Sequence, residues 1–344
     1  MKIISEHDER YVALLSKCLM AGGEHGLFNA GGVDVGAILK LRRFSELARQ
    51  FAESDGVAFK FDGGKVTPTS TGRRFRKLVN AGCGEVDEIY KLEPYSQLIV
   101  SEVNWPLLYT LLSHLRLPEH SLKISETLNE IADRIREKAR SPAFRAKLNS
   151  YHRSSNKNYR ELVKYEQALF DRYSRVLVLR LDLSYQKEHS SVSQSLAFQH
   201  RKRLFDNARS NSLFKNMLGY VTKLEHGVEK GFHFHCIFFF DGAKVREDIT
   251  LAKRIGEYWV SVITRGIGGY YNCNYAKEKY RRCGIGVVNY YDLDKREGLR
   301  LAIVYLTKTD LYMKLKAEGR ALTRGIMPDA PSGRGRPRTV ILPN

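Results

Sequence analysis

Apolar side chains recur every three or four positions over much of residues 1–150, a spacing that places them on one face of an α-helix. The pattern predicts helices at 11–20, 35–53, 105–115 and 122–138. One hairpin interrupts them, because Val57–Phe61 and Lys65–Thr67 flank an Asp-Gly-Gly turn that tolerates positive φ. We therefore expect a mainly helical N-terminal domain over residues 1–150.

The segment that follows this hairpin is unusually basic. Arg73–Lys77 contains four cations in five positions and continues into a predicted helix. A strand pair beside a basic helix could grip duplex DNA, but a basic helix can equally be an ordinary solvated face. Residues 1–150 are accordingly interpreted as an accessory or DNA-binding domain.

A polar stretch at Ser150–Asn158 precedes a change of pattern, and we set a domain boundary there. Residues 175–185 alternate as a strand does, with leucines on one face. Further strands are predicted at 218–225, 232–240 and 286–291, and helices at 192–209, 249–264 and 297–316. The connections after the first strands are too short for repeated parallel crossovers. The expected class over 151–316 is therefore α+β, a mainly antiparallel sheet with flanking helices.

The charge of the chain indicates a polyanionic partner. Lys and Arg number 57 against 38 Asp and Glu, which gives a net charge of +19. Nucleic acid fits this excess better than an anionic membrane, because no apolar run approaches the roughly 20 residues of a spanning helix. The Gly-, Pro- and Arg-containing residues 317–344 are predicted to be a basic flexible tail, which either lies along phosphates or is simply solvated.

The five cysteines are scattered and show no paired spacing, which is typical of a reducing compartment. The N-terminus has mixed charge in place of a basic end followed by an apolar core, so it does not read as a secretory signal. We expect a cytoplasmic protein with no membrane partner.

Two histidines in one predicted strand are the first candidates for chemistry. His233 and His235 are separated by one residue, so both imidazoles project from the same face. Such a pair suits a divalent cation. A short hairpin precedes the strand, and centring it on Glu229 puts Glu225 opposite His233. A register shift of one residue would send Glu225 to the other face, so the predicted ligand set depends on that turn.

A tyrosine and a lysine complete the candidate catalytic set. Tyr305 and Lys308 are three residues apart in a predicted helix and share one of its faces. A phenol with a pKa near 10 is a poor nucleophile at neutral pH, so it needs a metal or a cation nearby. Lys308 could supply that charge.

Other residues could bind DNA around this set. If Arg180 and Asp182 lie on the metal face, Arg180 could hold a phosphate and Asp182 could orient a ligand histidine; a structural ion pair is the alternative. The segment 269–282 interleaves tyrosines and cations, a mixture that suits unpaired bases or an ordinary exposed loop. Its candidates are Tyr271, Tyr275, Tyr280, Arg281 and Arg282.

The ordered set of Glu225, the Phe-His-Phe-His235 strand and the Tyr305-x-x-Lys308 helix resembles the HUH rolling-circle replication initiators. Longer phrases resemble inovirus-type replication proteins and the YagK/YfjJ C-terminal domain family: Gly219–Glu225, Gly231–His235, Phe240–Gly242, Tyr258–Trp259 and Tyr305–Tyr312. The resemblance covers roughly residues 170–326, under half of the chain.

This resemblance implies an HUH endonuclease fold that nicks single-stranded origin DNA. Tyr305 would form a 5′-phosphotyrosine and free a 3′-OH for a host polymerase, with Lys308 assisting. His233, His235 and Glu225 would hold Mg²⁺ or Mn²⁺. Two-tyrosine members place their second tyrosine four residues away, whereas the next one here is Tyr312, seven residues on. No phosphate-binding ATPase loop occurs in the sequence, so a separate host helicase is expected.

Three other functions remain open at this point. A zinc-binding regulator would use Cys236, Cys273 and Cys283 with a histidine, although no Cys-x-x-Cys pair is present. A non-catalytic origin-binding or RNA-binding module would need the charge but not Tyr305 with Lys308. A hydrolase would use the same metal site with water as the nucleophile.

Overall fold

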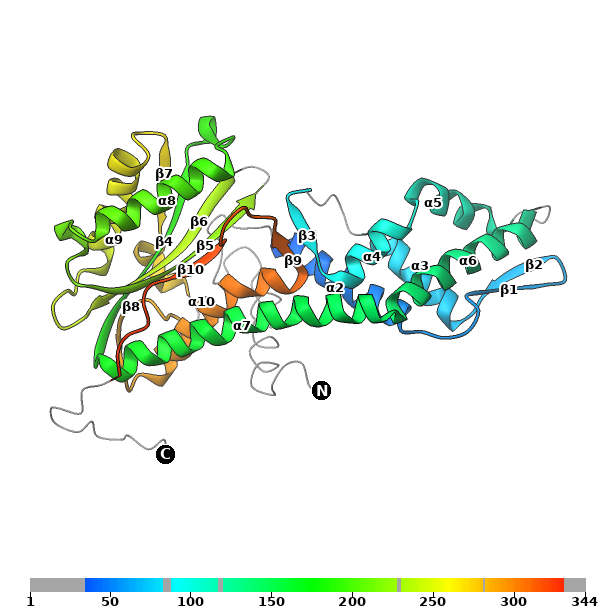
Figure 1. Cartoon of the computed structure of the whole chain (residues 1–344), viewed down its shortest axis with the longest axis horizontal. Coiled ribbons are helices and arrows are strands. Elements are labelled where there is room, and N and C mark those ends of the chain that lie inside the picture. The colour runs from blue at the N-terminus through cyan, green and yellow to red at the C-terminus, as the bar shows by residue number, and fades with distance from the viewer. Residues whose placement is uncertain (1–34, 83–87, 117–119, 228–229, 281, 331–344) are drawn as a thin grey trace. The chain divides into compact units, whose positions relative to one another are not determined.

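The computed structural model describes residues 35–82, 88–116, 120–227, 230–280 and 282–330 (Figure 1). The chain divides into two compact units. The helical unit consists of Val35–Ser155 and Thr309–Lys316, and the sheet unit contains Asn156–Lys308 and the described residues from Ala317 onward. The helix predicted at 11–20 lies outside the described residues.

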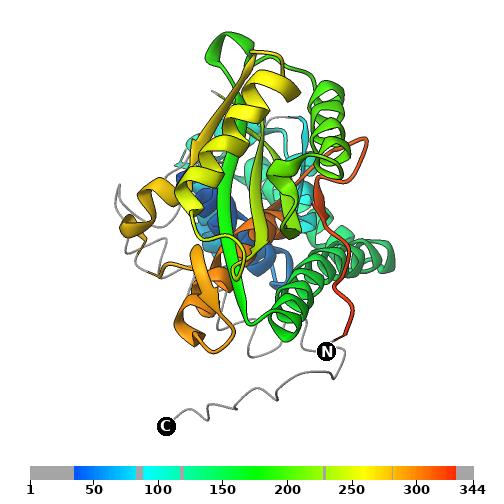
Figure 2. The same cartoon turned by 90° about the vertical axis from the view of Figure 1, so that its left-hand side faces the viewer.

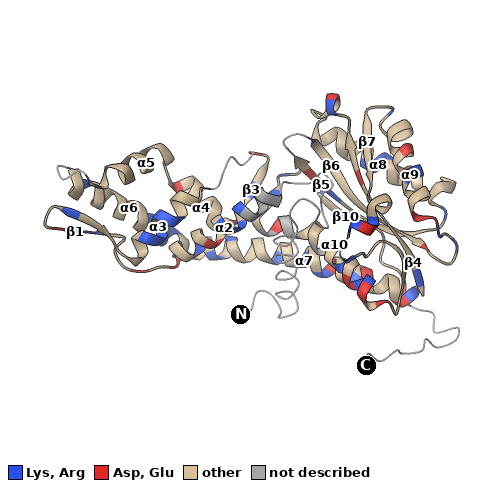
Figure 3. Cartoon of the chain, turned by 180° about the vertical axis from the view of Figure 1, so that it is seen from behind, with Lys and Arg blue, Asp and Glu red and all other residues tan. Residues whose placement is uncertain are grey.

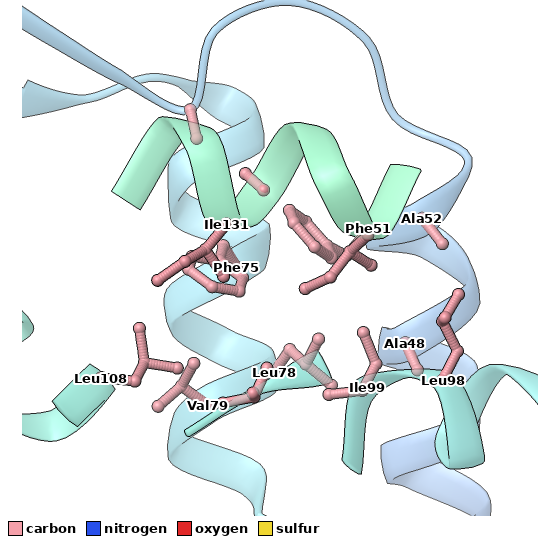
Figure 4. Packing of buried hydrophobic residues seen from close by; sticks show 14 of the residues in the cluster. Ala48, Phe51, Ala52, Phe75, Leu78, Val79, Leu98, Ile99, Leu108 and Ile131 are labelled. Atoms are coloured by element: carbon pink, nitrogen blue, oxygen red, sulfur yellow. The ribbon is translucent and has the colours of Figure 1, made fainter. Parts of the chain in front are cut away.

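Helices of the helical unit surround an aromatic core. Phe51 and Phe75 stack there with ring centroids 4.6 Å apart, beside Leu78, Ile99 and Ile131 (Figure 4). The elements are α2 (Val35–Ala52), β1 (Phe59–Asp62), β2 (Lys65–Pro68), α3 (Ser70–Ala81), β3 (Tyr90–Leu92), α4 (Pro94–Glu102), α5 (Trp105–Ser113), η1 (His114–Arg116), α6 (Ser121–Arg140), the first part of α7 (Pro142–Arg172) and β9 (Met313–Leu315).

The predicted hairpin is present as β1 and β2. Gly63 and Gly64 form its turn with φ of 53° and 79°, values that suit glycine because it lacks a Cβ.

The sheet unit is built on an antiparallel sheet in the order β10-β5-β6-β4-β7, with β8 also paired to β4. Its strands are β4 (Arg175–Tyr185), β5 (Met217–Gly227), β6 (Gly231–Asp241), β7 (Gly268–Asn272), β8 (Gly286–Asn289) and β10 (Leu322–Arg324). Helices α8 (Gln194–Ala208) and α9 (Asp248–Tyr258) lie above the sheet, and α7 and α10 (Leu293–Tyr312) lie below it (Figures 1 and 2). The predicted α+β class, with its antiparallel sheet, flanking helices and helical N-terminal region, is confirmed.

Both faces of the central strand β4 are buried, because helices cover the sheet on both sides. Val176 and Val178 join the core formed with α7 and α10. On the opposite face, Phe234 of β6 packs against Trp259 with ring centroids 6.0 Å apart. Trp259 begins a π-helical turn, Trp259–Ile263, so the helix predicted at 249–264 changes its winding after Tyr258.

Helix α10 begins earlier than predicted, at Leu293 rather than at residue 297. The side chain of Asp292 accepts a hydrogen bond from the backbone N–H of Lys295 at 3.2 Å, which is helix-capping geometry. The helix also ends earlier, at Tyr312, because Met313–Leu315 pair with β3 as strand β9. Asp292 was the capping signal that the prediction missed.

The expected flexible tail needs a correction for residues 317–330. Leu322–Arg324 form β10 and pair with β5, where Leu322 lies opposite Lys223. The edge of β5 has backbone groups that need hydrogen-bond partners, and β10 supplies them. Residues 331–344 lie outside the described residues.

The polar stretch at 150–158 is helical. Helix α7 runs from Pro142 to Arg172 and crosses the division between the two units, which falls between Ser155 and Asn156. In the described part of the chain, no helix is long and apolar enough to cross a membrane.

A buried ion pair fixes α10 to α7 within the sheet unit. The fully buried carboxylate of Glu166 accepts from Arg296 Nε at 2.9 Å and from Arg300 Nε at 3.2 Å. Removing one partner from such a group leaves buried charge without compensation.

Glu166→Gln should therefore lower the free energy of unfolding of the sheet unit by roughly 3 kcal/mol, the lower end of the range for a broken buried pair because both guanidiniums are partly exposed. Urea unfolding followed by Trp259 fluorescence in a Trp105→Phe background measures this. Glu161→Gln, on an exposed part of the same helix, is the control and should cost under about 1 kcal/mol. Equal losses in both variants would contradict the assigned role of Glu166.

Candidate metal centre

Three adjacent strands bring the predicted ligands together. In β6, His233 and His235 face the same side of the sheet, and Glu225 of β5 lies directly opposite His233, the register that the hairpin predicted. On the other side of β6, Asp182 of β4 lies opposite His235. These four side chains are buried on the sheet face that α7 and α10 cover.

Each histidine is held by a hydrogen bond through its Nδ1 atom. His233 Nδ1 lies 3.0 Å from the carbonyl oxygen of Gly231, and His235 Nδ1 lies 2.6 Å from Asp182 Oδ1. Both oxygens act as acceptors here, so both Nδ1 atoms carry hydrogen and the Nε2 atoms are left as candidate ligands. Partners of this kind orient the imidazole and raise its basicity as a metal ligand. Asp182 thus occupies the orienting position considered for it.

The three candidate ligands have polar atoms that are buried and form no hydrogen bond with any described residue. These atoms are both carboxylate oxygens of Glu225, Nε2 of His233 and Nε2 of His235. Nε2 of His235 lies 3.3 Å from Glu225 Oε2, but the two atoms do not form a hydrogen bond. Leaving such groups unsatisfied costs free energy, and native structures avoid it.

A metal ion would satisfy these atoms. One ligand atom each from Glu225, His233 and His235 lies within 4.8 Å of the others. One carboxylate and two neutral imidazoles form a ligand set typical of divalent cations of borderline hardness. The residues therefore fit a metal site, and the identity of the metal is a separate question.

The charges of the two histidines and of Glu225 and Asp182 shift one another's pKa values. Burial opposes the charged form of every member, but the histidines outweigh burial and lower the pKa of Glu225 to about 2. Burial and the charge of His235 lower the pKa of His233 to about 4. The carboxylates of Asp182 and Glu225 outweigh burial and raise the pKa of His235 to about 10. Asp182 and Glu225 therefore stay ionised, and their negative charge favours a bound cation.

Gly231 is required where β6 begins. Its φ is 62°, and a Cβ at this position would overlap the carbonyl oxygen of Ser190. The same residue supplies the carbonyl that orients His233. A substitution here would disturb the backbone and the imidazole together.

Tyr305 of α10 lies beside the metal group. Its ring centroid is 6.1 Å from that of His235, and the guanidinium carbon of Arg180 is 5.7 Å from the Tyr305 ring. The phenol is buried, at 3% exposure. Burial and the charge of Glu225 raise its pKa, while the charge of Arg180 acts in the opposite direction. The tyrosine is therefore a protonated phenol next to a cation and a candidate metal site.

The two other candidates in this helix are placed differently. Lys308 lies in α10, three residues after Tyr305, but its side chain is outside the described residues. Tyr312 belongs to the helical unit, where its carbonyl oxygen accepts from the backbone N–H of Glu93 at 2.8 Å.

The tyrosine-rich segment divides into exposed and buried members. Tyr271 and Tyr275 are exposed by 44% and 78%. Tyr280 packs against the core of the sheet unit, and burial raises its pKa, as does the nearby Cys273. Arg282 Nη1 forms an ion pair with Glu297 at 2.8 Å. Arg281 lies outside the described residues. Tyr271 and Tyr275 are therefore the two of these five candidates that are exposed to solvent and have no ion pair among the described residues.

Two buried residues near the site were not singled out in the sequence. Lys223 lies opposite His235 in β5, with 3% of its surface exposed. Asn274 is fully buried; its Oδ1 accepts from the N–H of Arg180 at 2.8 Å, and its Nδ2 donates to the carbonyl of Val178 at 3.0 Å. The hairpin that places Glu225 opposite His233 also implies the position of Lys223, but it does not reveal its burial, and no local pattern points to Asn274.

The potential metal ligands that cluster in the described residues do not include cysteine. Cys236 lies on the opposite face of β6 from His233 and His235, opposite Thr222 of β5. Cys236 and Cys273 are buried, and burial raises the pKa of both thiols. This arrangement does not support the zinc-binding regulator.

Comparison with known proteins gives one relationship. The family model of the YagK/YfjJ C-terminal domain matches residues 141–321, slightly more than half of the chain and most of the sheet unit. No curated protein and no solved structure matches.

Substitutions in the metal group should lower metal affinity in a graded way. Glu225→Gln and His233→Ala each remove a ligand and should abolish measurable Mn²⁺ binding. Asp182→Asn leaves all three ligands in place but weakens the hydrogen bond to His235, so the affinity should fall about 10- to 100-fold. Isothermal titration calorimetry on metal-free protein measures these affinities.

The exposed His114 of the helical unit provides the control, since His114→Ala removes an imidazole outside the sheet unit and should leave Mn²⁺ affinity unchanged. Unchanged binding in Asp182→Asn would mean that this carboxylate does not act through His235. Unchanged binding in Glu225→Gln and His233→Ala would show that the group is not the metal site.

Proposed function

This chain belongs to the YagK/YfjJ C-terminal domain family, and we propose that it is a metal-dependent DNA-nicking enzyme of the HUH class with Tyr305 as its nucleophile. The substrate is single-stranded DNA at a replication origin, and the product is a covalent 5′-phosphotyrosine with a free 3′-OH. This reaction would initiate rolling-circle replication, as in the inovirus-type proteins that the motifs resemble.

The observation that carries the proposal is the closeness of Tyr305 to the metal group. The phenol ring lies 6.1 Å from the ring of His235, although the two residues are 70 positions apart in the sequence. A binding module would not need a tyrosine beside buried, unsatisfied metal ligands. A nucleophile and a phosphate-polarising cation, by contrast, have to act on the same phosphate group.

The proposed reaction is a transesterification. The Tyr305 oxygen forms a bond to the scissile phosphorus, the bond from phosphorus to the 3′-oxygen breaks, and the phenolic proton is balanced by the proton that the 3′-OH gains. One phosphoester replaces another, so no oxidant or nucleotide cofactor is consumed. The stored phosphotyrosine bond allows a later strand to be rejoined by the reverse reaction.

Chain residues have separate tasks in this reaction. His233, His235 and Glu225 hold the cation, and Asp182 orients His235. When bound, a divalent cation such as Mg²⁺ or Mn²⁺ supplies the positive charge that polarises the phosphate. The charge of Arg180 acts against the raised pKa of Tyr305 and so favours the phenolate. Lys308 is proposed to add a second positive charge from the same helix.

The burial of Tyr305 sets a requirement for this mechanism. With 3% of its surface exposed, the phenol can meet a phosphate only if the segments that cover it move.

Exposed Tyr271 and Tyr275 offer rings on which unpaired bases could stack, and stacking is a common way to hold single strands. A host helicase and polymerase would be partners, since the sequence has no phosphate-binding ATPase loop.

Tyr305→Phe should abolish covalent capture of DNA, because it removes the attacking oxygen and retains the ring. The wild-type protein is incubated with a 5′-labelled and a 3′-labelled single-stranded origin oligonucleotide and Mn²⁺, and denaturing gels are used to detect a protein–DNA adduct. The adduct should retain the 3′-labelled part, consistent with a 5′-phosphotyrosine link.

Tyr312→Phe is the matched control and should keep the adduct. Loss of the adduct in Tyr312→Phe alone would overturn the choice of nucleophile. Cleavage without an adduct in the wild-type protein would favour the hydrolase, and binding without cleavage would favour the non-catalytic module.

Tyr275→Ala should weaken binding to a single strand. One base stacked on a tyrosine contributes about 1–3 kcal/mol, so the dissociation constant should rise roughly tenfold. Fluorescence anisotropy with a labelled oligonucleotide measures it. Tyr291 is also exposed, at 50%, and Tyr291→Ala is the control that should leave the constant unchanged. Equal weakening in both variants would exclude a specific role for Tyr275.

A further inference from the structure

Helix α3 of the helical unit has one buried face and one basic face. Thr71, Gly72, Phe75, Leu78 and Val79 are buried. The side chains between them are exposed and basic. Helix α3 contains no acidic residue, and Figure 3 colours its Lys and Arg positions blue. The exposed cations are Arg73, Arg74, Arg76 and Lys77. We call this face, together with Lys60 and Lys65 of the hairpin, the α3 basic surface.

Three cations of α3 differ from many others in the helical unit because no carboxylate among the described residues pairs with them. Elsewhere in the unit, exposed cations pair with carboxylates: Arg42 with Glu46, Arg49 with Glu53, Arg134 and Lys138 with Glu102, and Arg140 with Asp55. Within the described residues, no ion pair engages Arg74, Arg76 or Lys77. A concentration of uncompensated positive charge on one face attracts a polyanion.

The hairpin and α3 are held as one rigid element. Thr69 caps α3 by accepting from the N–H of Gly72 at 3.3 Å, and a Cβ on Gly72 would overlap the carbonyl oxygen of Ala58. Asn129 of α6 fixes the base of β1, because its Oδ1 accepts from the N–H groups of Ala58 and Phe59 at 3.0 and 2.9 Å. The cations are therefore presented on a scaffold that loses little conformational entropy on binding.

We propose that the α3 basic surface binds the sugar–phosphate backbone of double-stranded DNA, a function of the helical unit separate from the nicking of a single strand. Charge complementarity is the argument for a polyanion. An α-helix also fits the major groove of B-DNA, and the 12 residues of α3 make a helix about 18 Å long.

A duplex fits this surface better than a single strand. Binding to unpaired bases needs exposed aromatic rings. Among the aromatic residues of β1, β2 and α3, Phe59 and Phe75 are buried and Phe61 is exposed by 40%. The surface therefore supplies contacts to phosphates with little opportunity for stacking, which indicates sequence-tolerant backbone binding.

The test measures duplex affinity as a function of salt in the full-length protein. A labelled 20-base-pair duplex of arbitrary sequence is titrated by anisotropy against wild type and against Arg74→Gln/Arg76→Gln/Lys77→Gln. Each phosphate contact adds about 0.9 to the slope of log affinity against log salt, so the triple variant should reduce that slope by about 2 to 3. Its affinity at low salt should fall by at least about tenfold.

The control removes equal charge from exposed positions of α7: Arg145→Gln/Lys147→Gln/Arg153→Gln. It should change duplex affinity less than threefold. If both triple variants weaken binding equally, or if neither does, the α3 basic surface is not a duplex-binding site. The single variant Lys77→Gln should reduce the slope by about 1, and it tests the proposal even if the triple variant misfolds. Thermal unfolding of the triple variant shows directly whether it is folded.

The test of duplex binding by the α3 basic surface does not depend on whether Tyr305 nicks DNA. The α3 triple variant should still form the Tyr305 adduct with a single-stranded oligonucleotide, because none of its substitutions is in the sheet unit. Loss of the adduct together with loss of duplex binding would overturn the separation of functions. A stronger effect on single-stranded than on duplex DNA would overturn the choice of occupant.

Discussion

A buried carboxylate with no hydrogen-bond partner in the described part of the chain is the constraint on which the candidate metal site of the sheet unit depends. Glu225 is removed from solvent, and neither of its side-chain oxygens accepts a hydrogen bond from the residues that the structure describes. Burying such a charge costs several kcal/mol unless opposite charge lies close by. The imidazoles of His233 and His235 reduce that cost, and a bound divalent cation would offset more of it. The register of β5 on β6 is what keeps these groups together, since a shift of one residue would separate them.

The metal group also depends on parts of the fold that are far away in sequence. Asp182 reaches His235 because β4 pairs with β6. Asn274 holds β4 by accepting from the N–H of Arg180 and donating to the carbonyl of Val178, and it also donates to Asp248 of α9. Glu166 binds Arg296 and Arg300, which fixes α10 and with it the position of Tyr305. The proposed nucleophile on a rigid helix and the candidate metal site on a rigid sheet suit a reaction in which small displacements are costly.

The two units carry different kinds of surface, and this difference gives the excess charge of the chain a more specific meaning. The sheet unit exposes tyrosines at 271 and 275, which suit unpaired bases. The helical unit exposes a cluster of cations on α3 with few aromatic rings, which suits a duplex. The proposed origin-nicking enzyme would meet both forms of DNA, because the strand to be nicked would be flanked by paired segments.

The sequence alone determined the features that depend on short-range geometry. The alternation of β6 puts His233 and His235 on one face, and a hairpin turn of a few residues sets Glu225 opposite them; both follow from the two-residue period of a strand. It also predicted the fold class, the hairpin at Gly63 and Gly64, and the shared helix of Tyr305 and Lys308. Tertiary structure decided how the site is completed: Asp182 pairs with His235, and Tyr305 lies close to that histidine. It also decided that Tyr280 packs inward, that α7 continues through 150–158 and that β10 joins the edge of β5. Each of these depends on contacts between segments separated by tens of residues, where burial and pairing partners, and not local periodicity, select the conformation.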